Sequence, residues 1–440
     1  MPMPMPMPMP TFLPPSSPNP PSRPPCPLQS AQHRALMQAA ECAAMGLAGR
    51  SRQIEAQRFL PHDIADALAE AGLYRLLTPL AYGGFEAPPA SFALIIERLA
   101  RADAAAAWCC FIACTASMLA AYLPEPDARA VFSRPTLKAA GVFAPRGRAV
   151  ATEQAGAPGL RVSGRWAWGS GAHNADVISA GCLLIGPDGQ PGLLPDGTPR
   201  VVSVLLDRAQ LQLIDNWDSF GLCGTGSGEF EVHDAFVPLG RSASLFDGPR
   251  IGTPLYRFPV FGLLALAIAA VATGIAREAL DAFIGQASQS VPQAGSRPLA
   301  AKATVQAAVA QAEASLQAAR AYLLASIDAA WQAAHQAADE TPNPPVGPSA
   351  SPPDGASTTA LPLAQRRNIR LAASHAVHTS AAVVTRLYTL AGGGAVFASS
   401  PLQRCLRNVQ VATPHMMVND ASFELTGRLL LGVPTPTHML

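Results

Sequence analysis

The chain has 440 residues, of which 49% are hydrophobic and 14% are charged, and its formal net charge is +1. This length allows one large domain or two to three ordinary ones, and the near-zero charge argues against binding to nucleic acid or to a membrane. The 8 cysteines form no CxxC pair and no Cys/His metal spacing, so we expect reduced thiols, no metal site and a cytoplasmic location.

The chain is predicted to begin with a tail and a helical domain. Residues 1–31 are rich in proline and lack the charged start and apolar core of a signal peptide, so we expect a disordered tail. Residues 32–137 show helical apolar spacing, with Pro61 placed to open a helix and Gly72 to close one. This pattern predicts an N-terminal helical domain.

A change of pattern near Lys138 predicts a second domain. Residues 138–247 contain short β-branched or aromatic runs separated by Gly, Pro and Asp. Strands of this length with turn signals at this spacing are typical of a small antiparallel β domain.

Helical spacing returns over residues 248–440, interrupted by a Pro- and Ser-rich segment at 340–362. We expect a C-terminal four-helix bundle with a disordered loop at that segment. The apolar stretch Phe258–Ala276 is long enough to span a bilayer, but it is dominated by alanine and lacks a basic flank. We expect a buried helix there. The whole chain is thus predicted to be α+β, mainly α.

Two short segments of the middle domain suggest a ligand site. In "GRWAWGSG", Trp166 and Trp168 alternate, which places both rings on one face of a strand, ahead of a turn at Ser170. They form either a packed aromatic face or a platform for a flat ligand. The loop "FGLCGTGSGEF" is either an anion-binding turn or a plain β-turn. It matches neither a P-loop nor a GxGxxG motif, because no helix follows.

Four motifs in this order resemble the acyl-CoA dehydrogenase superfamily, most closely its reduced-flavin-dependent monooxygenases. They are "LYRLLTPLAYGGFEAPPASFALIIERLARADAAAAW", "SGRWAWGSGAHNADV", "WDSFGLCGTGSGEFEVHDAFVP" and "AGGGAVFASSPLQRCLRNVQVATPH". The likeness covers about residues 32–434. It implies the acyl-CoA dehydrogenase fold for the three predicted domains.

The resemblance also implies a flavin site. The residue matching Ser170 donates a hydrogen bond near flavin N5 and O4, and one of the two tryptophans forms a wall against the ring. The segment matching "AGGGAVF" reaches the cofactor of a neighbouring subunit, which implies a homotetramer. The expected cofactor contacts are Phe143, Ala144, Trp166, Trp168, Ser170, Gly171, Thr225, Ser227, Gly392, Gly393 and Arg404.

The fourth motif implies the reaction. Where the dehydrogenases carry a catalytic glutamate, this chain has His415, as the monooxygenase branch does, so His415 and Ser170 are the expected catalytic residues. A separate reductase would supply FMNH2 or FADH2. Reaction with O2 would give a flavin C4a-hydroperoxide that oxygenates a small aromatic, sulfur or nitrogen substrate. The second histidine found in some of these monooxygenases is missing from "CCFIACTASMLAAYL".

Two alternatives remain open at this point. One is an FAD-containing acyl-CoA dehydrogenase with a displaced base. The other is an oligomeric protein that keeps the fold without catalysis. The choice between FMN and FAD and the identity of the substrate are also open.

Overall fold

The computed structural model describes residues 27–194, 197–291, 296–340 and 361–440. Most of the predicted tail and most of the predicted loop at 340–362 lie outside the described residues. The first part of the chain is helical, as predicted, and forms α1 (Ala31–Leu47), α2 (Ser51–Gln57), α3 (His62–Glu70), α4 (Pro89–Ala102), α5 (Ala104–Ser117) and α6 (Glu125–Phe132).

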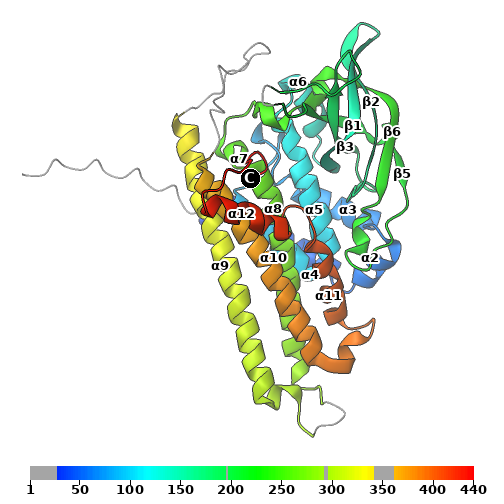
Figure 1. The fold of residues 1–440 in the computed structure, drawn as a ribbon. Helices are drawn as coiled ribbons and strands as arrows, with labels where there is room; N and C mark the ends of the chain where they lie inside the picture. Colours follow the sequence, from blue (N-terminus) through cyan, green and yellow to red (C-terminus); the bar gives the residue numbers. More distant parts are fainter. Residues whose placement is uncertain (1–26, 195–196, 292–295, 341–360) are drawn as a thin grey trace, which may run out of the picture.

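Helix α5 is the central element of the molecule. The Asp103 side chain caps its N-terminus and accepts hydrogen bonds from the backbone N–H groups of Ala105 and Ala106, both at 3.0 Å. Every residue of α5 except Ile112 is buried, because the helix is apolar on all sides and has neighbours on all sides. It packs on α4, α8 and the sheet, between the helical layers and β1 (Figure 1). Side chains on α5 therefore reach both halves of the molecule.

The middle of the chain forms a single seven-stranded sheet in the order β5-β6-β2-β1-β3-β4-β7. The strands are β1 (Ala139–Gln154), β2 (Ala157–Trp166), β3 (Val177–Ile185), β4 (Val201–Asp207), β5 (Gln212–Ile214), β6 (Glu229–Pro238) and β7 (Ser242–Ala243).

The prediction of a purely antiparallel sheet is wrong for one pair of strands. Strands β1 and β3 run parallel, while the other pairs are antiparallel. After β2 the chain crosses back over residues 167–176 and starts β3 beside the beginning of β1, where the Asp176 N–H donates to the Lys138 carbonyl oxygen at 2.7 Å. The crossover that makes the sheet mixed is the segment that contains Ser170.

A bulge in β1 lies beside this crossover. The register between β1 and β3 shifts between Val142 and Gly147, and a Cβ atom at Gly181 would lie 2.3 Å from the carbonyl oxygen of Phe143. Glycine at position 181 therefore allows the bulged backbone to approach β3.

The last part of the chain is helical. It contains α7 (Pro254–Arg257), α8 (Val260–Ala287), α9 (Ala303–Glu340), α10 (Leu363–Ala391), α11 (Pro401–Ala412) and α12 (Asp420–Leu430). Helices α8, α9 and α10 lie side by side along most of their length, with α11 beside α8 and α10 (Figure 1).

In the part of the chain that the structure describes, two helical segments are long and apolar enough to cross a membrane, but both are mostly buried. They are Val260–Ala287, with 83% of its most apolar window buried, and Ala104–Ala121, with 94% buried. The expectation of a buried helix over Phe258–Ala276 is confirmed.

The close packing of α8 on α4 gives a test of the fold. A Cβ atom at Gly274 would lie 2.5 Å from the carbonyl oxygen of Glu97, so Gly274→Ala should lower the free energy of unfolding by about 1–3 kcal/mol through overpacking. Gly285 lies in the same helix with open space at its Cβ position, so Gly285→Ala should raise that free energy by about 0.5–1 kcal/mol. Urea unfolding of both variants measures the difference, and equal midpoints would contradict this packing.

Candidate active site

The crossover over residues 167–176 folds onto the loop that precedes β6. The Gly171 N–H donates to the Thr225 carbonyl oxygen at 2.9 Å, and both Trp168 and Gly171 adopt left-handed backbone conformations, with φ of 70° and 75°. This turn buries the Ser170 side chain, which is 4% exposed, against the loop. The structure thus brings together Ser170, Gly171, Thr225 and Ser227, four of the residues named above as cofactor contacts; their role as contacts stays a prediction.

Three buried hydroxyl groups form a hydrogen-bonded chain in this turn. Ser170 Oγ lies 2.6 Å from Ser227 Oγ, which lies 2.6 Å from Thr225 Oγ1. The Thr225 hydroxyl donates to the Leu222 carbonyl oxygen at 2.8 Å. Because each hydroxyl carries one proton, Thr225 must accept from Ser227, and Ser227 must accept from Ser170.

This direction bears on the predicted role of Ser170, the donation of a hydrogen bond to a flavin, which stays a prediction. Its proton points at Ser227, and its oxygen accepts the indole N–H of Trp108 at 3.2 Å. Toward a bound group Ser170 therefore offers its remaining lone pair as an acceptor, whereas the resemblance implied a donor.

Trp108 joins the two predicted catalytic residues. Its ring centroid lies 5.9 Å from that of His415 at an interplanar angle of 67°, an edge-on aromatic contact. One indole thus touches Ser170 through its N–H and His415 through its ring. The sequence analysis missed this residue. A tryptophan directly after an alanine run on an apolar helix was the available signal, but it does not tell which neighbours the ring meets.

His415 lies in the turn between α11 and α12 and is neutral. Its Nδ1 accepts the Met417 backbone N–H at 3.2 Å, so the proton of the neutral ring is on Nε2. Burial and the nearby Arg370 guanidinium lower the pKa of His415 to about 4. At neutral pH its free nitrogen is therefore a hydrogen-bond donor that carries no charge.

No described carboxylate takes the place of the family's glutamate beside His415. The nearest acidic residue in the sequence, Asp420, has a side chain that is 95% exposed, 4.0 Å from Nε2 of His378. The charge that acts on His415 is the positive one of Arg370.

The two tryptophans at the end of β2 have opposite surroundings. Trp166 is fully buried, stacks on Phe230 at 5.2 Å and donates its N–H to the Gly181 carbonyl oxygen at 2.7 Å. Trp168 is 68% exposed and packs edge-on against Trp217 at 5.8 Å. The prediction of a ligand-facing ring is therefore wrong for Trp166, which belongs to the core of the sheet, and stays open for Trp168.

The remaining predicted cofactor contacts lie on other elements than the hydroxyl chain. Phe143 and Ala144 sit on the β1 bulge, Phe143 partly buried and Ala144 exposed. Gly392 and Gly393 follow α10 and are exposed, with open space at their Cβ positions. Within one subunit these two glycines are not brought to Ser170.

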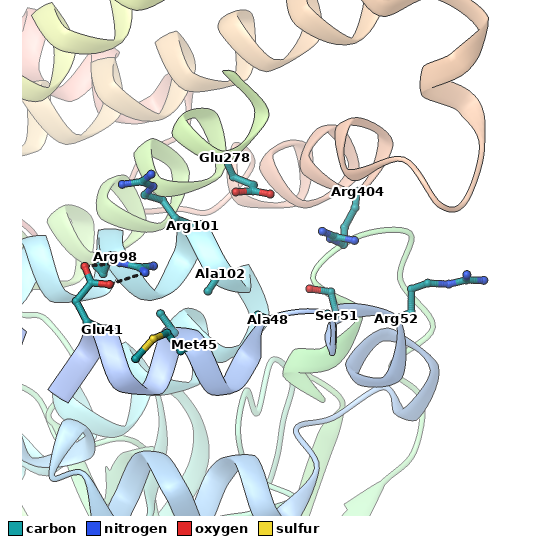
Figure 2. A pocket seen from close by; sticks show the side chains of 12 residues that line it. Glu41, Met45, Ala48, Ser51, Arg52, Arg98, Arg101, Ala102, Glu278 and Arg404 are labelled. Atoms are coloured by element: carbon teal, nitrogen blue, oxygen red, sulfur yellow. Dashed lines mark hydrogen bonds and ion pairs between the residues drawn. The ribbon is translucent and has the colours of Figure 1, made fainter. Parts of the chain in front are cut away.

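Arg404 lines a different cavity, of about 770 Å3. Figure 2 shows Arg404 and Glu278 on one side of it and Ser51 on the other. Two further arginines of the lining are paired, Arg98 with Glu41 and Arg101 with Asp281. Neither Ser170 nor His415 belongs to this lining.

The residues around Trp108 suit a flat, uncharged ring system. Ser170 offers one acceptor, His415 offers one donor, and the ring of Trp168 is exposed next to the turn that holds Ser170. These groups fit a flavin with an aromatic substrate better than a phosphate or a metal. Among the residues that the structure describes, no cluster of three or more His, Cys, Asp or Glu side chains could hold a metal ion.

Comparison with known families places matches at both ends of the chain. The family described as "Acyl-CoA dehydrogenase, N-terminal domain" matches residues 30–125. The family described as "Acyl-CoA dehydrogenase, C-terminal domain" matches residues 266–346 and 353–420.

Curated relatives match over nearly their whole length. The indole-3-acetate monooxygenase of Pseudomonas putida is 31% identical, over 90% of this chain and 94% of the relative. The oxygenase subunit HsaA of a flavin-dependent monooxygenase from Rhodococcus jostii is 28% identical, over 92% of this chain and 100% of the relative.

Solved structures share the fold. XiaF from Streptomyces, in complex with FADH2 and glycerol, superposes with a TM-score of 0.80 at 23% identity, over 92% of this chain and 97% of XiaF. The 3-HSA hydroxylase from Rhodococcus superposes with a TM-score of 0.79 at 24% identity, over 94% and 100% of the two chains.

The neutrality of His415 predicts how stability depends on pH. The folded protein keeps this ring neutral down to about pH 4, whereas a histidine in the unfolded chain gains its proton near 6.5. Between these values the unfolded state binds more protons, so stability should fall as the pH is lowered from 6.5 to 4. His415→Gln should flatten this fall without abolishing it, because the pKa values of His173 and His33 are lowered too. Denaturant unfolding at several pH values measures both slopes, and identical slopes would refute the assignment.

Proposed function

The chain belongs to the acyl-CoA dehydrogenase family and, within it, to the flavin-dependent monooxygenases, and from this premise we propose that it is the oxygenase component of a two-component system acting on a small aromatic substrate. It uses reduced flavin, FMNH2 or FADH2, and O2. Reduced flavin supplies the two electrons with which one oxygen atom of O2 is added to the substrate and the other is reduced to water.

The observation that carries this proposal is the position of Trp108 between Ser170 and His415. A ring system bound against this indole has an acceptor at one edge and a neutral donor at the other. The names of the curated relatives, which include indole-3-acetate monooxygenase and resorcinol hydroxylase, support an aromatic substrate.

Ser170 would hold the reduced form of the flavin. The reduced ring carries a hydrogen on N5 and the oxidised ring does not, so an acceptor at the ring edge favours the reduced form. The chain of hydroxyls prevents Ser170 from turning its own proton outward, because Ser227 and Thr225 are already committed as donors. The specificity for reduced flavin thus lies in the direction of these hydrogen bonds.

His415 would hold its proton at Nε2 and offer it to an oxygen atom of the reacting groups. The buried ring of Phe111 packs edge-on against Trp108 at 4.9 Å and keeps water away from that side of the indole. A dry surface prevents the loss of reducing equivalents to peroxide.

The same proposal covers the partners. The sequence has no nucleotide-binding fingerprint for NAD(P)H, so a separate reductase would supply the flavin. We place the protein in the cytoplasm as a homotetramer. The exposed apolar side chains of Val396 and Phe397, 60% and 65% exposed beside Gly392 and Gly393, are suited to burial by another subunit.

The direct test mixes the protein anaerobically with FMNH2 or FADH2 and then with oxygenated buffer containing indole-3-acetate or indole as aromatic probes. We expect a delay before oxidised-flavin absorbance appears, and an oxygenated product detected by mass spectrometry. Reoxidation as fast as that of free flavin, with peroxide as the only product for every probe, would refute the proposal. Bleaching of the FAD-loaded protein by an acyl-CoA would then favour a dehydrogenase.

A substitution within the hydroxyl chain tests the specificity for reduced flavin. Ser227→Ala frees the Ser170 proton to turn outward, so the ratio of affinities for reduced and oxidised flavin should fall about tenfold, the equivalent of one hydrogen bond. Ser242→Ala in β7 is the control, because this hydroxyl donates to the carbonyl oxygen of Leu239, outside the chain of hydroxyls. Anaerobic and aerobic equilibrium titrations measure the ratio, and an unchanged ratio in Ser227→Ala would show that the chain does not set it.

A further inference from the structure

Arg370 is a buried cation without a carboxylate partner in the described part of the chain. It lies on α10 and is 2% exposed. Its guanidinium donates to the Met439 carbonyl oxygen at 2.7 Å, to Ser422 Oγ at 3.0 Å and to Met417 Sδ at 3.4 Å, and its Nε has no partner among the described residues. Burial lowers the pKa of Arg370 to about 10. Burying a charge among neutral acceptors is costly, so its position calls for an explanation.

The three acceptors of Arg370 belong to the three segments that follow His415. Met417 is in the turn that carries His415, Ser422 is in the first turn of α12, and Met439 is in the segment after α12. These three segments therefore meet at Arg370.

Two further side chains of α10 also bond to the segments that follow His415. Arg366, one helical turn before Arg370, donates to the Thr437 carbonyl oxygen. His378, two turns after it, contacts the Val418 carbonyl oxygen through Nε2 at 3.2 Å. Leu440 is only 3% exposed and Met439 is half-buried, whereas His438 is exposed, so the segment Thr437–Leu440 is anchored in the molecule at its last two residues. Helix α10 thus holds both the His415 turn and this last segment.

We propose that Arg370 and the segment Thr437–Leu440 form a clamp that positions His415 in the active site. Arg370 is a positioning residue in this scheme, since it reaches the imidazole only through Met417 and through its charge. The inference deepens the proposed function, because it assumes that His415 acts in the reaction, but the geometry it describes does not depend on any substrate.

The clamp has two effects on His415. Mechanically, the contact with Met417 fixes the residue whose N–H bonds to His415 Nδ1, and so fixes the ring. Electrostatically, the guanidinium opposes a second positive charge on the ring. Other charged or titratable groups around the clamp are His378 on α10 and the exposed Asp420 on α12, which lie 4.0 Å from each other, together with Arg366 on α10 and the exposed His438 in the last segment.

The test is an NMR titration of the histidine rings in the protein without flavin, with the His415 signal assigned by its loss in His415→Gln. In Arg370→Met, which removes both the charge and the contacts, we expect the pKa of His415 to rise from about 4 toward 6.5. Arg370→Lys keeps the charge but not the three contacts, so the rise should be smaller. Removal of residues 437–440 should also raise the pKa, because it opens the turn to water.

Arg367→Met is the matched control. Arg367 is the third arginine of this part of α10 and bonds only to the neighbouring Asn368 side chain, so its loss should leave the pKa of His415 and the pH profile of activity unchanged. If Arg370→Met does not fold, Arg370→Lys and the deletion decide the question.

An unchanged pKa of His415 in every folded variant of Arg370 and of the segment would overturn the clamp. Since this readout needs neither flavin nor substrate, it separates the clamp from the proposed function. If the wild-type protein has no oxygenase activity but the variants show the expected shifts in the pKa of His415, the proposed function is refuted and the clamp is not.

Discussion

The hydrogen-bonded chain from the Trp108 indole to the Leu222 carbonyl oxygen is the interaction on which the site depends. It joins α5, the crossover between β2 and β3, and the loop before β6. All three hydroxyls are buried, so each needs both its neighbours. None of the three elements can move without leaving a buried polar group unpaired, which costs about 1–3 kcal/mol for each group. The chain therefore fixes the place of Ser170 and the direction in which it offers its lone pair.

This chain can form only because the surrounding elements approach closely. A Cβ atom at Gly224 would lie 2.1 Å from Ile54 Cγ2, so glycine lets the loop before β6 sit directly on α2. Arg407 then ties the same loop to α2, bonding to the Phe220 carbonyl oxygen at 2.6 Å and to Glu55 at 2.8 Å. The many alanine and glycine residues thus allow the layers to pack closely. The few charged residues include long arginine side chains that join one layer to the next.

The sequence predicted the order of helices, sheet and bundle, because the change from helical to short-strand patterns is strong along the chain. It also singled out Ser170, Thr225 and Ser227, but it did not predict that their hydroxyl groups bond to each other. The prediction from the sequence failed where a turn of the backbone interrupts the alternation of side chains along a strand. Alternation put Trp166 and Trp168 on one face, but β2 ends at Trp166 and the left-handed φ of Trp168 turns the second ring outward. The parallel pairing of β1 with β3 and the contacts of Trp108 arise only from tertiary structure, which no spacing of residues encodes.

The surroundings of position 415 act differently on the pKa of a histidine and on that of a carboxylate. For a carboxylate, burial would raise the pKa and the Arg370 guanidinium would lower it, so the two effects oppose each other. For His415 both act in one direction and keep the ring neutral. The site then presents a neutral imidazole, an indole and a hydroxyl, with no charge within their contacts. Such a surface suits the uncharged ring of an aromatic ligand, which can pack on the indole without losing hydrogen bonds to water. The exchange of one residue relative to the dehydrogenase pattern thus changes the electrostatics of the site, because burial and Arg370 act together on His415 where they would oppose each other on a carboxylate.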